Sequence, residues 1–216
     1  MKSLSKAVAV ASLLSAGIMS AQVANAETEY SAQIDSTYLY RGENIGGGAA
    51  LFSGGADYSH ESGAYAGLWV ANTPEYDLYA GFAMDAGDVS IDVGAITYVY
   101  PGDTDAAPLD GVEAYLNVGF MGASLSYNVG LESLEDSSYI ALGYEVAGVS
   151  LTYGIVDDGF GKEFSHIDAS YGLTDELSIT VSQAMDDSDV AKTTANGTAP
   201  AVEDMQIVVS YTLPIK

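Results

Sequence analysis

The chain has 216 residues, of which 30 are Asp or Glu, 6 are Lys or Arg and none is Cys, so its formal net charge is -24 at pH 7. This charge excludes nucleic acid as a partner, because phosphate groups are bound by Lys and Arg. The lack of Cys excludes disulfides, thiol catalysis and cysteine-ligated metals. A hydrophobic fraction of 48% excludes a disordered acidic chain.

Residues 1–26 are predicted to be a secretory signal peptide. Lys2 and Lys6 precede an apolar run from Ala7 to Met19, and Ala24-Asn25-Ala26 fits the small-x-small cleavage pattern. The apolar run is shorter than the roughly 18 residues that a membrane-spanning helix needs. We therefore expect a mature domain over residues 27–216.

The mature chain alternates apolar and polar residues with a period of two. Val112, Ala114 and Leu116 alternate with Glu113 and Tyr115, for example. Such runs predict strands with one apolar and one polar face. Twelve are predicted, over residues 28–41, 48–59, 64–71, 75–85, 88–100, 111–120, 123–131, 137–146, 149–157, 163–173, 176–186 and 204–215.

Links between these strands alternate in length. Two-residue turns such as Met121-Gly122 and Ala147-Gly148 alternate with longer links such as 101–110 and 187–203, and 72–74 is the one short link among the longer ones. All five prolines fall in links or at the end of the last strand. An even strand count with this alternation predicts an all-β fold, a transmembrane antiparallel up-and-down β-barrel of the cell outer membrane, with short turns facing the periplasm.

The two faces of the predicted strands differ in chemistry. The outer face mixes Leu, Val and Ile with tyrosines near strand ends, as in the aromatic girdles of membrane barrels. The inner face is small and polar, rich in Gly and Ser. The tyrosines assigned to the outer face are Tyr38, Tyr40, Tyr58, Tyr76, Tyr127, Tyr144, Tyr153, Tyr171 and Tyr211.

Acidic side chains are predicted to point into the lumen, where no Lys or Arg is expected to pair with them. The mature cations lie in loops or at strand ends: Arg41, Lys162, Lys192 and Lys216. Unpaired buried carboxylates need water or mobile cations, so the sequence favours a wet lumen that prefers cations. The candidate pore-lining residues are Asp35, Asp57, Asp77, Asp92, Glu113, Glu145 and Asp168.

Two other interpretations remain open. Gln33, Thr37, Asn117 and lumenal tyrosines could hydrogen-bond the acids and leave a closed structural or adhesive barrel without transport. A soluble, secreted acidic β-sandwich is the third. The expected partners of the barrel are outer-membrane lipid and lipopolysaccharide, the barrel-assembly machinery and small hydrophilic solutes. The acidic loops are interpreted as a solvated surface rather than as a binding site.

No enzymatic activity, cofactor or metal site is expected. His166 shares a strand face with Asp168 and Ser170, but neighbours on one face lie roughly 7 Å apart, too far for the nucleophile–base hydrogen bond of acyl transfer. His60 lies at a predicted periplasmic turn. No acidic run has the spacing of a calcium-binding loop.

Three segments in the first third of the mature chain carry a family resemblance: Ser36-Thr37-Tyr38-Leu39-Tyr40-Arg41-Gly42, the run 55–69 beginning Gly55-Ala56-Asp57-Tyr58, and Glu75-Tyr76-Asp77-Leu78-Tyr79-Ala80-Gly81. Together they resemble the TorF-type (Gcw_chp) family of proteobacterial outer-membrane porin-like proteins. The resemblance implies an outer-membrane barrel and passive transport, with no substrate or catalytic residue. One departure is the end of the chain, Leu213-Pro214-Ile215-Lys216, where such barrels usually end on an aromatic residue.

Overall fold

The computed structural model describes residues 26–101, 111–186 and 205–215. The predicted signal peptide, apart from Ala26, lies outside the described residues, as does the predicted long loop 187–203. Within the described ranges no helix is long and apolar enough to cross a membrane.

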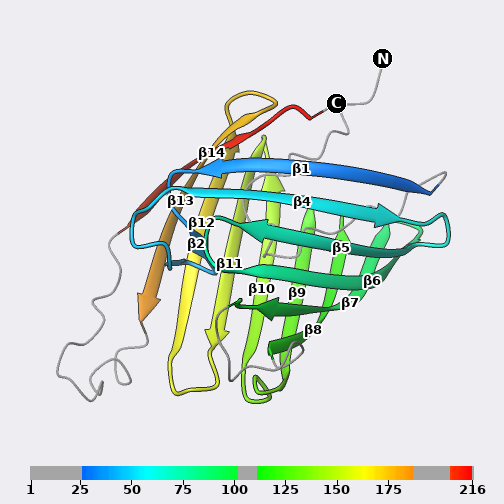
Figure 1. Ribbon diagram of the computed structural model, residues 1–216, viewed down its shortest axis with the longest axis horizontal. Coiled ribbons are helices and arrows are strands. Elements are labelled where there is room, and N and C mark those ends of the chain that lie inside the picture. The colour runs from blue at the N-terminus through cyan, green and yellow to red at the C-terminus, as the bar shows by residue number, and fades with distance from the viewer. Residues whose placement is uncertain (1–25, 102–110, 187–204, 216) are drawn as a thin grey trace.

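Twelve antiparallel strands form one closed barrel, so the predicted fold class is confirmed (Figure 1). Each strand pairs with its neighbours in the chain, and β1 pairs with β14 to close the ring. Strands β4–β6 cross the direction of β10–β12 in Figure 1, because barrel strands tilt against the axis. The barrel strands are β1 (Glu27–Asp35), β4 (Leu51–Ser59), β5 (Ala64–Ala71), β6 (Tyr76–Ala86), β7 (Val89–Val99), β8 (Gly111–Phe120), β9 (Ala123–Glu132), β10 (Ser138–Val146), β11 (Val149–Asp157), β12 (Glu163–Gly172), β13 (Leu177–Asp186) and β14 (Gln206–Thr212).

The closing pair is the shortest in the barrel. β1 pairs with β4 over nine residues, from Glu27 to Asp35, but with β14 over only three, Gln33 to Asp35. Two backbone bonds extend this contact: Ser36 N–H donates to Val209 O over 2.9 Å, and Leu213 N–H donates to Ala32 O over 2.8 Å.

Tight turns close one end of the barrel, as predicted. Met121-Gly122 and Ala147-Gly148 each place both residues at positive φ (48° and 83°, 52° and 78°). Two positive φ values in succession are what a type I′ hairpin turn requires, and its twist matches that of the strands it joins. We call this end, where β1 begins and β14 finishes, the short-turn end, and the opposite end the long-loop end.

The predicted alternation between the two faces holds around the wall. Large apolar side chains such as Leu116, Leu142 and Ile167 are exposed on the outside, together with tyrosines such as Tyr127 and Tyr153. Their strand neighbours turn inward and are buried. An exposed apolar band on this scale is atypical of a soluble protein and suits a lipid environment.

The first predicted strand, 28–41, was wrong in its second half. β1 ends at Asp35, and two short strands follow, β2 (Leu39–Tyr40) and β3 (Glu43–Asn44), which form a two-stranded sheet of their own. Tyr38 and Tyr40 consequently pack inside the barrel rather than on its outer face. The period-two pattern is interrupted here by Ser36 on the apolar face and Leu39 on the polar face, but these two residues do not reveal that the chain leaves the wall.

Candidate functional site in the barrel lumen

A hairpin formed by residues 38–48, which we call the lumen hairpin, crosses the lumen at the long-loop end. Its side chains reach strands on all sides of the barrel. The Tyr40 hydroxyl lies 3.1 Å from that of Tyr98 on β7, and Asn44 donates to Gln206 on β14 over 3.0 Å. Tyr38 packs on Trp69 of β5, with ring centroids 6.0 Å apart. A segment that contacts such widely separated strands must lie across the lumen.

Arg41 at the hairpin tip forms a fork-to-fork ion pair with Glu113 of β8. Nη1 donates to Oε1 over 2.9 Å and Nη2 donates to Oε2 over 2.6 Å. The two side chains are only 6% and 5% exposed, and the guanidinium lies over the rings of Tyr40 and Tyr139, at 4.8 and 4.5 Å. The expectation that no basic residue pairs with the lumenal acids is therefore wrong for Glu113, because the loop that carries Arg41 folds inward.

The backbone of the tip explains why Gly follows Arg41. Arg41 and Gly42 have φ values of 46° and 86°, again the pair of positive values that a two-residue hairpin turn needs. A Cβ at Gly42 would overlap the side chain of His166 on β12. Only glycine lets the tip rest this closely against the wall.

Strands β4–β8 line their part of the lumen with tyrosines bonded to acids, a lining that we call the tyrosine–acid wall. The Tyr65 hydroxyl donates to Asp92 over 2.5 Å, and Asn117 donates to the other oxygen of Asp92 over 3.1 Å. Tyr79 donates to Asp57, and Tyr98 donates to Glu113 over 3.1 Å. These acids have protein donors rather than the open, hydrated surroundings expected from sequence.

The opposite part of the lumen is lined by small hydroxyl side chains, which we call the hydroxyl wall: Ser150, Thr152, Ser170, Thr180 and Ser210. A cavity of about 130 Å³ lies between this wall and the underside of the lumen hairpin. Asp35, Asp168 and the hairpin residues Arg41 and Gly42 also line it. Free volume remains on this side because Ser and Thr are far smaller than the tyrosines opposite.

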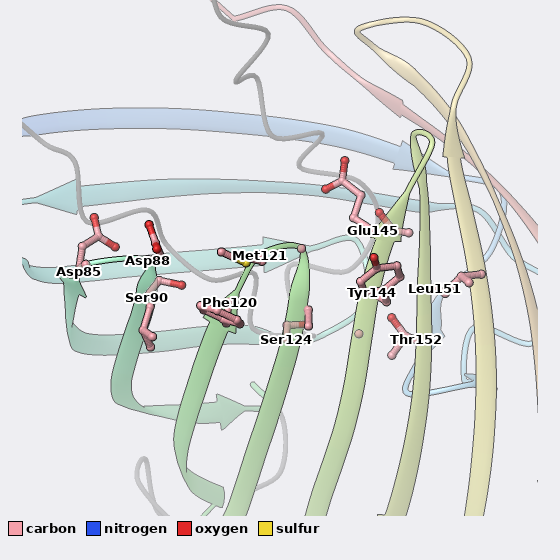
Figure 2. A pocket seen from close by; sticks show the side chains of 17 residues that line it. Asp85, Asp88, Ser90, Phe120, Met121, Ser124, Tyr144, Glu145, Leu151 and Thr152 are labelled. Atoms are coloured by element: carbon pink, nitrogen blue, oxygen red, sulfur yellow. The ribbon is translucent and has the colours of Figure 1, made fainter.

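A wider cavity of about 530 Å³ lies at the short-turn end, between the ends of β6–β11 (Figure 2). Its inward residues are small, among them Ser90, Ser124 and Gly143, and the acids at its edge are Asp85, Asp88 and Glu145. Ser150 and Thr152 line both this cavity and the one beneath the hairpin. The two cavities therefore follow one another from the short-turn end to the hairpin.

The seven acids proposed as pore-lining residues occupy three kinds of place. Asp57, Asp92 and Glu113 belong to the tyrosine–acid wall. Asp35 and Asp168 line the cavity beneath the hairpin, and Glu145 is exposed at the short-turn mouth.

Asp77 is the exception among them. It is fully buried, and neither of its carboxylate oxygens has a hydrogen-bond partner among the described residues. It lines neither cavity.

His166 contacts Asp168 more closely than strand spacing suggested. Its Nδ1 lies 3.1 Å from Asp168 Oδ2, and Tyr139 stacks on its ring with centroids 5.8 Å apart. The Ser170 hydroxyl is instead paired with Thr180 at 2.8 Å. No three metal-binding side chains come together within the described ranges.

Sequence reasoning missed Arg41 as a lumenal residue. One signal was present: Arg41-Gly42, followed by Gly46-Gly47-Gly48, is a cluster of turn residues at the end of an otherwise regular strand pattern. It marks a turn but not the direction in which the chain turns.

Residues 21–212 match the model of a family described as bacterial protein of unknown function (Gcw_chp). The chain belongs to this family. The resemblance found in the sequence is thereby confirmed for the Gcw_chp family, whereas the label TorF-type stays a prediction. No curated protein matches this Gcw_chp chain.

Solved structures similar to this Gcw_chp protein are outer-membrane barrels with low identity. A mutant of the Rh. blastica porin is 14% identical with a TM-score of 0.42, over 76% of this chain and 55% of that one. The outer membrane protein OpdK of Pseudomonas aeruginosa is 14% identical, TM-score 0.39, over 79% and 58%. Outer membrane phospholipase A of Escherichia coli is 11% identical, TM-score 0.40, over 87% and 89%. The matched part of this chain thus spans little more than half of the two porin-type chains.

Proposed function

We propose that this Gcw_chp protein is an outer-membrane channel for passive diffusion of small hydrophilic solutes, with a preference for cations. The observation that carries the proposal is the succession of two polar cavities that share Ser150 and Thr152 and run from the short-turn end to the lumen hairpin. A barrel that served only as a scaffold would have no need of a hollow, hydroxyl-lined side.

The outer surface supports a place in the outer membrane. Apolar side chains such as Leu116 and Ile140 face outward along the strands, and Tyr144 and Tyr171 lie toward the strand ends. The strands also pair into a closed ring, the form in which a sheet spans lipid, with β1 and β14 joined over three residue pairs. The predicted signal peptide supplies export, and assembly in a membrane rich in lipopolysaccharide through the barrel-assembly machinery follows from that location.

The charges along the cavities support cation preference. Asp85, Asp88 and Glu145 lie at the short-turn mouth, and Asp35 and Asp168 lie deeper. Arg41 is the basic residue on this path, and Glu113 offsets its charge. A path with an excess of acids raises the local concentration of cations and repels anions.

The size of the inner cavity limits the solute. Its volume of about 130 Å³ is below the roughly 300–1,000 Å³ of pockets that hold drug-sized ligands, so the cavity suits small ions and solutes. The Ser170 hydroxyl, on the same strand face as the His166–Asp168 pair, is bonded to Thr180. A channel without enzymatic activity is the simpler function for this lining.

A closed structural barrel is the second candidate, and the lumen hairpin is the observation that favours it. The hairpin fills the long-loop end with buried contacts, of which the Arg41–Glu113 pair is the strongest. On this alternative the cavities hold only trapped water.

Single-channel recording of the refolded mature chain in a planar bilayer under a salt gradient separates the two. Conductance steps with a cation-biased reversal potential are expected, and replacing Asp35 and Asp168 together by Asn should reduce that bias. Asp175→Asn, an exposed acid in the β12–β13 turn that lines neither cavity, is the control. Silence from a chain shown to be folded and inserted would contradict transport and favour the structural barrel.

A further inference from the structure

We infer that the lumen hairpin is a gate: a small folded unit, pinned by Arg41 to Glu113, that closes the long-loop end and leaves it as one body when the channel opens. This inference rests on the proposed channel function and adds its regulation.

The hairpin is a separate unit of backbone structure. β2 and β3 pair with each other in a sheet distinct from the barrel sheet. Further backbone bonds stay within the segment: Ile45 N–H and Gly46 N–H both donate to Tyr38 O, over 3.0 and 3.3 Å. The ladder of barrel hydrogen bonds can therefore remain intact while the hairpin moves.

Glycines flank the hairpin where it rejoins the wall. Gly47 and Gly48 have φ values of 59° and 83°, and a Cβ at either position would meet no atom within 4 Å. Such residues tolerate large changes in backbone angle and have free space around them. These are the properties of a hinge.

Side chains attach the hairpin to the wall at discrete points. The Arg41–Glu113 fork is the buried one, and a charge-assisted fork of this kind is among the stronger polar contacts in proteins. Near the rim, Lys162 in the β11–β12 link pairs with Glu43, but both side chains are partly exposed, so this pair contributes little. The Arg41 pair is thus the one buried ion pair of the attachment, and uncharged hydrogen bonds such as Tyr40–Tyr98 and Asn44–Gln206 add to it.

The hairpin also covers the inner cavity on the side of the long-loop end. Its residues Leu39, Arg41 and Gly42 line that cavity opposite the hydroxyl wall. Removing these residues from the lumen would open the cavity toward the long-loop end, while Ser150 and Thr152 at its other end also line the cavity of the short-turn mouth. The position of the hairpin therefore decides whether the inner cavity is open toward the long-loop end.

The first test weakens the pin. Arg41→Gln and Glu113→Gln each keep polar groups at the site but remove the ion pair, and each should raise the open probability in planar bilayers by about tenfold or more, the change expected from losing hydrogen bonds between charged groups. Glu176→Gln removes an exposed acid in the turn at the opposite end and serves as the control with unchanged opening. An unchanged open probability in both pin variants would overturn the inference.

The second test holds the hairpin in place. The native chain has no Cys, so Asn44→Cys with Gln206→Cys introduces two thiols at side chains that contact each other across the hairpin–wall boundary. A short bifunctional methanethiosulfonate should abolish the conductance, and dithiothreitol should restore it. Each single-Cys variant, treated alike, should keep its conductance, and a cross-linked double variant that still conducts would contradict the gate.

The outcomes separate this inference from the function on which it rests. If no variant conducts, including those without the pin, the channel proposal fails. If the wild type, the pin variants and the cross-linked protein conduct equally, the channel stands and the hairpin is a fixed constriction rather than a gate.

Discussion

Arg41 and Glu113 lie 72 residues apart in the chain, yet both arms of the guanidinium donate to the two carboxylate oxygens, at 2.9 and 2.6 Å. Burying both charges requires this geometry, because a buried carboxylate or guanidinium without a partner is strongly unfavourable. Arg41 also adopts a positive φ, which is unfavourable for a residue with a side chain. Backbone strain at a buried ion pair is a common mark of a functional element, and it agrees with the role inferred for the hairpin.

Gly42→Ala should dislodge the hairpin tip. A Cβ there would overlap His166, and the φ of 86° adds strain of about 1–2 kcal/mol. Gly47→Ala is the matched control, because its φ is also positive but its surroundings are open. We expect Gly42→Ala to lower the free energy of unfolding by at least about 1 kcal/mol more than Gly47→Ala, the cost of overpacking. Equal effects in denaturant titrations would show that the tip does not rest on His166.

Asp77→Asn should stabilise the barrel. Its carboxylate is buried and has no hydrogen-bond partner among the described residues, so an uncharged amide of the same shape removes a desolvation penalty of about 1–3 kcal/mol. Asp92→Asn should do the opposite, since it disturbs the bonds from Tyr65 and Asn117. Thermal unfolding in detergent at pH 9 compares the two, and destabilisation by both would mean that Asp77 has a partner in the protein.

Leu116→Arg should destabilise the protein in bilayers by about 2–4 kcal/mol, the cost of a cation near the midplane of a barrel's lipid face. Leu116 is exposed in the middle of β8, whereas Phe120 is exposed at its end. Phe120→Arg should therefore cost only about 0–1 kcal/mol. Similar stabilities for the two variants in lipid vesicles would contradict the proposed depth of the strand in the membrane.

Glu75 gives the barrel a pH dependence that can be isolated. It lies in the β5–β6 link, and burial raises the pKa of its carboxyl above the ordinary 4.5, although hydrogen bonds from Tyr100 and Tyr38 partly oppose this. The folded state then holds the proton more tightly than the unfolded state, so this group's contribution to stability falls as the pH rises from 4.5 through the raised pKa. Glu75→Gln should flatten that fall in thermal unfolding measured from pH 4 to 8. A variant whose unfolding midpoint follows the wild type at every pH would remove Glu75 from the titration.

Local pattern predicted the wall of this barrel but not its contents. A period of two determines which side chain faces out, so Leu116 was correctly assigned to the outer face and Asn117 to the inner face. The Met121-Gly122 pair between two alternating runs correctly predicted a tight turn. The inward course of residues 36–50 depends on contacts with six strands distant in sequence, which no local pattern contains. For the same reason Tyr38 and Tyr40 were placed in lipid, and Arg41 was placed outside the lumen.

The short contact between β1 and β14 has a consequence for the biogenesis of the protein. Three residue pairs close the ring, and the Asn44–Gln206 bond ties the hairpin to the same final strand. An assembly intermediate without β14 in place would lack a sealed wall and, at the same time, an anchor for its hairpin. The final strand therefore couples closure of the wall to the seating of the hairpin.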